Sequence, residues 1–240
     1  AKDVKVTVTS DKILMLLPEE PMMPRLADYR VGVRPFMQAD FSDPLRGLER
    51  VFYTRRWRLE PTDKAAHERG EAVEPVKPIV WYVDDAFPES WKEPIKKAVL
   101  RWNQAFEKIG FKNVMQVHDF PKNDPNFDPD NLKYSCIRYI PSNTQNAMGP
   151  SWVDPRSGEI LNASVYIYHN LVSLLYTWRM LQTAAVDPSV RQITLPEEVM
   201  GDAIRYVARH EVGHCFGLMH NMASSNAFPT DSLRSATFTQ

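Results

Sequence analysis

The chain has 240 residues, of which 43% are hydrophobic and 25% charged, the proportions of a folded protein rather than of a disordered one. Its 29 lysines and arginines nearly balance 30 aspartates and glutamates, so the net charge of -1 provides no field for holding nucleic acid. Apolar runs such as residues 171–178 are too short to cross a bilayer, and we expect no membrane span.

The first part of the chain differs in pattern from the rest. Alternating valines at 4–8, an apolar run at 13–17 and an aromatic-containing stretch at 51–59 predict three strands. We therefore interpret residues 1–59 as a strand-rich N-terminal extension or the remnant of a preceding domain. Residues 60–78 are rich in charge and proline, which is typical of a linker, and we expect the main domain over residues 79–240.

From residue 79 the pattern indicates a regular α+β domain. IVWYV at 79–83 predicts a buried strand, and the apolar spacing at 90–109 predicts a helix that starts with a capping box of Ser90 and Glu93 and ends at Gly110. Further strands are predicted at 112–117, 135–140, 147–153 and 160–167, the last two joined by the turn DPRSGE. These strands suggest a mixed sheet.

Two more helices are predicted after the sheet. The first is apolar, starts at Asn170 and ends before Asp187 and Pro188. The second starts with a capping box of Thr194 and Glu197 and has an amphipathic pattern. Its predicted core-facing residues are Met200, Ile204, Val207, Ala208 and Cys215.

The second of these helices leads into HEVGHCFGLMH at residues 210–220. Two histidines four residues apart lie on one helical face, so His210 and His214 can bind one metal ion. Glu211 lies beside them, where it can take a proton from a water at the metal. Gly217 can adopt a positive φ, which lets the chain bend back and bring His220 to the same ion. Three imidazoles leave one position of a tetrahedral zinc open, as in catalytic zinc sites.

With HExxHxxGxxH at 210–220, the sequence resembles the metzincin metallopeptidases. The predicted order of strand, long backing helix, sheet with an edge strand and active-site helix is similar to theirs. GPSWVDPRSGEILNA at 149–163 resembles a group of large secreted bacterial metzincins, and the likeness covers about residues 78–240. The resemblance implies a metzincin-like catalytic domain with a mixed twisted sheet, and a secreted, periplasmic or cell-surface location.

Carried to this sequence, the resemblance makes His210, His214 and His220 the ligands of one catalytic Zn²⁺, with Glu211 as general base and acid. It implies an endopeptidase whose partner is a peptide or protein, bound along the edge strand at 147–153. Two alternatives stay open. One is a zinc-binding or structural module without turnover, against which Glu211 argues; the other is a zinc hydrolase of non-peptide substrates, which the ligands alone do not exclude.

Metzincins also carry a methionine in a turn beneath the zinc, downstream of the third histidine. Met222 is the only later methionine, and two residues past His220 leave no room for the chain to loop under the metal. We therefore expect the domain to be truncated before the Met-turn and the C-terminal subdomain. Residues 221–240 should then be poorly packed or docked differently, and zinc binding and peptidase activity should be weak.

Two other segments offer carboxylates. The loop NDPNFDPDN at 123–131 has oxygen ligands for calcium but lacks the glycine and glutamate of an EF-hand, and we favour ordinary polar turns. Its candidate residues are Asp124, Asp128 and Asp130. Residues 24–32 could lie in the cleft as a pro-segment with Asp28 on the zinc, but we favour an ordinary strand or loop.

The remaining candidates are cysteines and histidines. Cys215 follows a ligand but faces the apolar side of its helix, so we favour core packing, with a disulfide to Cys136 as the alternative. Three more histidines have no partner at ligand spacing and are expected to be surface or structural residues: His67, His118 and His169.

Overall fold

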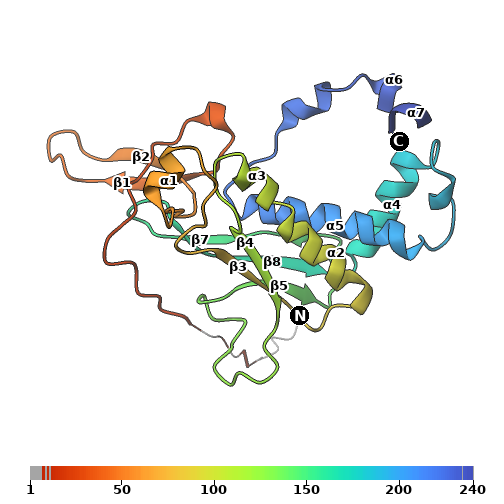
Figure 1. The fold of residues 1–240 in the computed structure, drawn as a ribbon, viewed down its shortest axis with the longest axis horizontal. Helices are drawn as coiled ribbons and strands as arrows, with labels where there is room; N and C mark the ends of the chain where they lie inside the picture. Colours follow the sequence, from red (N-terminus) through yellow and green to blue (C-terminus); the bar gives the residue numbers. More distant parts are fainter. Residues whose placement is uncertain (1–6, 9, 11, 234, 240) are drawn as a thin grey trace, which may run out of the picture.

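A computed structural model describes residues 7–8, 10, 12–233 and 235–239, and its centre is a mixed sheet (Figure 1). The strand order is β4-β3-β5-β8-β6, with β7 also paired to β8. The four strands β3, β4, β5 and β8 are parallel, whereas β6 and β7 run antiparallel to β8 at one edge. The bounds are β3 (Ile79–Val83), β4 (Met115–Asp119), β5 (Ser135–Ile140), β6 (Ala147–Met148), β7 (Ser151–Val153) and β8 (Ile160–Tyr168).

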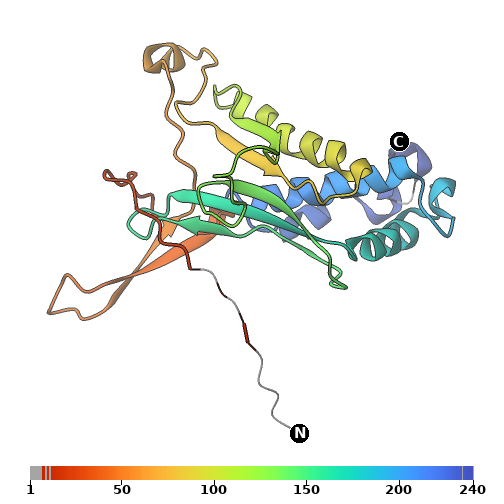
Figure 2. The same ribbon diagram turned by 90° about the horizontal axis from the view of Figure 1, so that it is seen from below.

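Helices α2 (Glu89–Leu100) and α5 (Glu197–His214) pack against each other and against the same side of the sheet (Figure 2). Their apolar faces meet the buried side chains of β3 and β8 in one core, which includes Trp81, Ile95 and Ile204. Two further helices, α3 (Asn103–Glu107) and α4 (Leu171–Thr183), flank this pair, and a short 3-10 helix, η2 (Pro188–Val190), leads from α4 toward α5. The architecture confirms the expected α+β class.

The predicted helix at 90–109 is two helices. It is interrupted at Arg101 and Trp102, where the Trp102 N–H donates to the Val99 carbonyl in a tighter turn. The interruption lets the Trp102 indole turn toward α5 and donate to the Arg209 carbonyl at 3.2 Å. Gly110 has φ +80 beyond α3, as the sequence indicated.

Both predicted capping boxes are wrong. The N-cap residues are Pro88 for α2 and Pro196 for α5, and neither makes a side-chain cap hydrogen bond. Ser90 lies inside the first turn of α2, and Thr194 lies before the N-cap of α5. In both cases a proline with fixed φ precedes the first helical residue and sets the start of the helix.

The strands predicted at 79–83 and 135–140 are confirmed with these limits, and the one predicted at 160–167 extends to Tyr168; the other two differ from the prediction. The strand expected at 112–117 begins only at Met115, where the chain meets β3. The strand expected at 147–153 is divided into β6 and β7 by Gly149 and Pro150. Proline has no N–H for a ladder, so the pairing to β8 is interrupted at this point.

The N-terminal part forms a hairpin of β1 (Pro35–Asp40) and β2 (Glu49–Thr54), preceded by the 3-10 helix η1 (Tyr29–Val31). The predicted strand at 13–17 is wrong: these residues lie in no strand, and Leu14 and Leu16 are almost fully exposed. A strand requires a paired neighbour, and none of the described residues provides one there. The strand expected at 51–59 is found only as far as Thr54, where β2 ends. Most of the strand expected at 4–8 lies outside the described residues.

Residues 60–78 contain the short helix α1 (Lys64–Glu68), whose N-cap Asp63 accepts a hydrogen bond from the Ala66 N–H at 2.9 Å. Ala66 and Val73 are buried and belong to the core. The segment expected to be a linker is therefore packed on the domain. The division of the chain at residues 59 and 78 stays a prediction.

Residues 221–240 carry only short elements, η3 (Met222–Asn226), α6 (Thr230–Leu233) and α7 (Ala236–Thr239). None of the side chains described in this stretch is buried, and Met222 is 74% exposed. Throughout the described chain, no helix has the length and apolar character that a membrane span requires.

Candidate metal centre

The structure brings the three motif histidines together. His210 and His214 lie one turn apart on the last turns of α5, and His220 returns to them after the helix ends. Its Nε2 atom lies 3.0 Å from Nε2 of His210 and 3.2 Å from Nε2 of His214. Nitrogens bound at about 2.0–2.1 Å to a tetrahedral zinc are about 3.3–3.4 Å apart, so this donor set fits a zinc ion.

The ring of His214 is held in the orientation that a ligand needs. Its Nδ1 lies 2.9 Å from the Leu218 carbonyl oxygen, which can only accept, so Nδ1 carries the proton and the Nε2 lone pair faces the cluster. The pKa of His210 is lowered by burial and by the neighbouring His214 and His220. The neutral imidazole, which is the form that binds metals, is therefore favoured at His210.

Gly217 ends the helical stretch and turns the chain toward His220. Its φ is +86, and its N–H donates to the His214 carbonyl at 2.8 Å. A Cβ at this position would lie 2.8 Å from the Arg55 carbonyl oxygen. Glycine is thus required both by the backbone conformation and by the close approach of another segment.

Glu211 lies on α5 between the two helical histidines and is 8% exposed. Burial, which disfavours the charged form, raises the pKa of Glu211 to about 6, and nearby His220 opposes this rise. Glu211 lines the same cavity as the three histidines. A residue with a proton-accepting side chain therefore lines the cavity of the histidine cluster.

The cavity has a volume of about 500 Å³ and is bounded on one side by residues 146–150. In the described part of the chain, β6 pairs with β8 on one side only, which leaves its other edge open for pairing. Another part of the lining, the apolar wall, is formed by Leu171, Leu174, Trp178, Tyr206 and Val207. The centre thus combines ligand nitrogens, a carboxyl, an open strand edge and an apolar wall.

Two residues at this site were not singled out from the sequence. Gly149 packs against the helix backbone, where a Cβ would lie 2.3 Å from the Glu211 carbonyl oxygen. Arg34 lines the cavity although it comes from the N-terminal part. Gly149 is the first residue of the stretch 149–163, which resembles the bacterial metzincins. Nothing in the local sequence around Arg34 indicates that Arg34 reaches the site.

The other carboxylates are engaged elsewhere. Asp28 is the N-cap of η1 and pairs with Arg30, so it serves its own turn rather than the histidine cluster. Asp124 and Asp128 accept backbone N–H bonds at 2.9 Å within their turns, and Asp130 pairs with Arg138 at 2.7 Å. These are the contacts of polar turns, and calcium binding there stays a prediction.

The two cysteines are free and buried, so the alternative of a disulfide is wrong. Cys215 faces the core, as expected. Among the remaining histidines, Nδ1 of His67 lies 3.2 Å from the Gly110 carbonyl oxygen, and Nδ1 of His169 lies 2.6 Å from the Tyr139 hydroxyl. His118 is exposed.

Residues 192–240 match a family model described as Met-zincin. This range contains α5, all three histidines and Glu211. Residues 1–62 match a second model, described as a domain of unknown function, DUF5117. No curated protein and no solved structure matches the chain. The Met-zincin match and a histidine cluster that can bind a metal ion together make the chain zinc-metallopeptidase-like.

Proposed function

We propose that the protein is a zinc-dependent endopeptidase in which His210, His214 and His220 hold the zinc. The observation that carries the proposal is the convergence of three Nε2 atoms in a cavity that Glu211 also lines. The Met-zincin match over the same residues supports it. A secreted, periplasmic or cell-surface location is part of the proposal, because the resembled proteins are secreted.

A zinc ion bound there supplies a Lewis acid that polarises the scissile carbonyl and makes water more acidic. Glu211 acts as the general base: its carboxylate accepts a proton from the attacking water and then transfers it to the nitrogen of the leaving amine. The Leu218 carbonyl keeps the His214 ring in its ligand orientation throughout. The peptide bond is broken and one water is consumed.

The open edge of β6 supports a peptide as the substrate. Its unpaired backbone groups can hydrogen-bond an extended chain, which then adds to the sheet beside the histidines. The apolar wall accommodates a side chain of that peptide. A small ester or amide has no extended backbone to pair with this edge, so the open strand favours a peptide over a non-peptide substrate.

The test combines zinc analysis with hydrolysis of an unfolded protein. Wild-type chain and Glu211→Gln should each hold one zinc, while Glu211→Gln should lose about a hundredfold or more of the hydrolysis rate. His214→Ala should lose stoichiometric zinc at neutral pH, whereas the exposed His118→Ala should retain it. Zinc retained by His214→Ala would overturn the site, and unchanged hydrolysis by Glu211→Gln would remove that carboxylate from the mechanism. Weak hydrolysis is expected where the Met-turn is missing, so the rates of the two chains are compared: a wild-type chain that binds zinc but cleaves no faster than Glu211→Gln would be a zinc-binding module.

A further inference from the structure

The loop that carries His220 is paired with a segment from the other end of the chain. Val33 and Leu218 form an antiparallel bridge. The Arg34 N–H donates to the Gly217 carbonyl at 2.6 Å, and the Met219 N–H donates to the Gly32 carbonyl at 2.9 Å. These bonds bracket the stretch between the turn at Gly217 and the third histidine.

The same turn is contacted from a second side by the residues that follow β2. The Arg55 carbonyl lies against the Cα of Gly217, where no side chain would fit. The Trp57 indole donates to the Cys215 carbonyl at 2.9 Å. The chain between α5 and His220 is therefore enclosed by two stretches of the N-terminal part.

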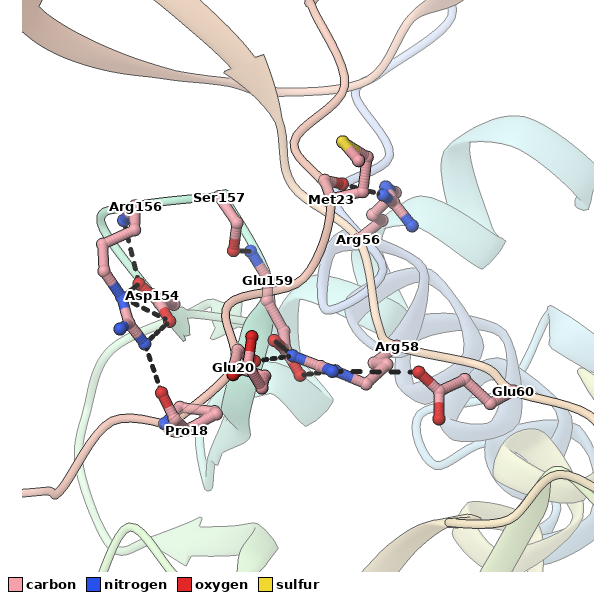
Figure 3. Close-up of polar contacts among 10 residues, drawn as sticks. All are labelled: Pro18, Glu20, Met23, Arg56, Arg58, Glu60, Asp154, Arg156, Ser157 and Glu159. Carbon is pink, nitrogen blue, oxygen red and sulfur yellow. Dashed lines mark hydrogen bonds and ion pairs between the residues drawn. The ribbon is translucent and has the colours of Figure 1, made fainter.

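The residues that follow β2, together with residues 18–20, are fixed to the turn between β7 and β8 by arginines (Figure 3). Arg58 makes a two-pronged contact with Glu159, at 2.9 Å and 2.7 Å, and also donates to the Glu20 carbonyl at 2.8 Å. Arg156 pairs with the fully buried Asp154 at 2.7 Å and donates to the Pro18 carbonyl at 2.6 Å. The Glu159 side chain is only 8% exposed, so the carboxylate of this pair is shielded from water, whereas the Arg58 side chain is 29% exposed.

His220 needs such support more than the other two ligands. His210 and His214 are held by the hydrogen bonds of α5, but the side chains of Leu218, Met219 and His220 are all exposed and anchor nothing in the core. The contacts that fix this stretch are backbone bonds, and two of them come from Gly32 and Arg34.

We propose that residues 32–34 position His220, so that the third metal ligand depends on the N-terminal part that matches DUF5117. The inference rests on the proposed zinc site. On this inference the N-terminal part supports the site rather than blocking it. Loss of the backbone bonds between residues 32–34 and the loop before His220 should therefore weaken metal binding.

The test measures zinc affinity by competition with a chromophoric chelator in the full chain. Arg34→Pro removes the N–H that bonds Gly217, whereas the matched control Arg34→Ala removes the side chain and keeps that N–H. Because Arg34→Ala already accounts for the loss of the side chain from the cavity, the two variants are compared with each other. We expect Arg34→Pro to bind zinc about tenfold or more weakly than Arg34→Ala, the usual scale for a contact that orients a ligand. Circular dichroism verifies that both variants are folded.

A double-mutant cycle separates positioning from general destabilisation. In a His220→Ala background the proline should cause no further loss, because the ligand on which it acts is gone. An equal loss in both backgrounds, or none in either, would overturn the inference while leaving the zinc site intact. If the wild type bound no zinc, the proposed function itself would fail.

If Arg34→Pro does not fold, hydrogen exchange of the wild-type chain decides. The Met219 amide should exchange slowly, because it donates to the Gly32 carbonyl. Exchange at the rate of an unstructured chain would contradict the pairing and the inference with it.

Discussion

Two neighbouring residues at the end of α5, His214 and Cys215, differ in burial and therefore in chemistry. His214 is half-buried and offers its Nε2 to the cluster, whereas the next residue, Cys215, is fully buried and faces the core. Burial raises the pKa of Cys215 well above its ordinary value, and it raises the pKa of Cys136 to about 12. The sequence places the Cys215 thiol next to His214, but this thiol faces the core and is protonated, so it cannot join the histidine cluster in binding a metal.

Both thiols should therefore be unreactive in the native protein. Only the thiolate attacks a disulfide reagent, and a raised pKa leaves almost none at pH 8. We expect no rapid labelling by Ellman's reagent in buffer and two thiols per chain after unfolding without reductant. Rapid native labelling would contradict the burial of the cysteines, and fewer than two thiols after unfolding would indicate a disulfide.

Close approach between elements sets the walls of the site. The segment between β6 and β7 meets α5 at Gly149, where a Cβ would lie 2.3 Å from the Glu211 carbonyl and 3.2 Å from the Cys215 sulfur. On its other side α5 meets Trp102 at Gly213, with a Cβ distance of 3.1 Å. The absence of two side chains thus lets the edge strand and the turn before α3 come close enough to the helix to frame the histidines.

Gly149→Ala should force the edge strand away from α5. We expect the free energy of unfolding to fall by about 1–3 kcal/mol, the scale of overpacking at a close contact, because helix backbone cannot yield as a flexible side chain does. Urea denaturation measures the change. The matched control is Gly201→Ala within α5, where the Cβ meets only the Pro94 ring at 3.3 Å and helix propensity improves, so the change should stay below about 1 kcal/mol. Equal effects of the two substitutions would contradict the packing at Gly149.

The whole molecule is joined by contacts between residues distant in sequence. The N-terminal part reaches the metal centre through residues 32–34 and is fastened to the sheet through Arg58 and Glu159. Because the glutamate is buried, loss of the arginine leaves a carboxylate with little access to water. The N-terminal part and the sheet should therefore unfold together.

Arg58→Ala should lower the free energy of unfolding by about 2–4 kcal/mol, near the range for breaking a buried pair and reduced because the arginine is partly exposed. A second change, Glu159→Gln, should recover part of the loss by removing the unpaired charge. The control Arg50→Ala, at an exposed position in β2, should change the free energy of unfolding by about 0.5 kcal/mol or less.

Thermal unfolding of the wild-type chain, followed by circular dichroism and by tryptophan fluorescence, should give one shared transition. Two separate transitions would contradict the coupling.

The sequence by itself determined the features that depend on local spacing. The buried strand at 79–83, the helix that presents His210 and His214 on one face, and the turn at Gly217 follow from periodicity and from the conformational freedom of glycine. The histidine cluster was predictable because its three members lie within eleven residues.

Only the tertiary structure decided which segments meet. The pairing of Val33 with Leu218 and the contact of Gly149 with α5 join residues far apart in the chain, and no local pattern encodes either. The break at Trp102 arises for the same reason, since the indole turns toward a helix that follows much later. Local propensities decide whether a segment can be helix or strand, whereas packing and backbone pairing with distant segments decide where it ends and what it supports.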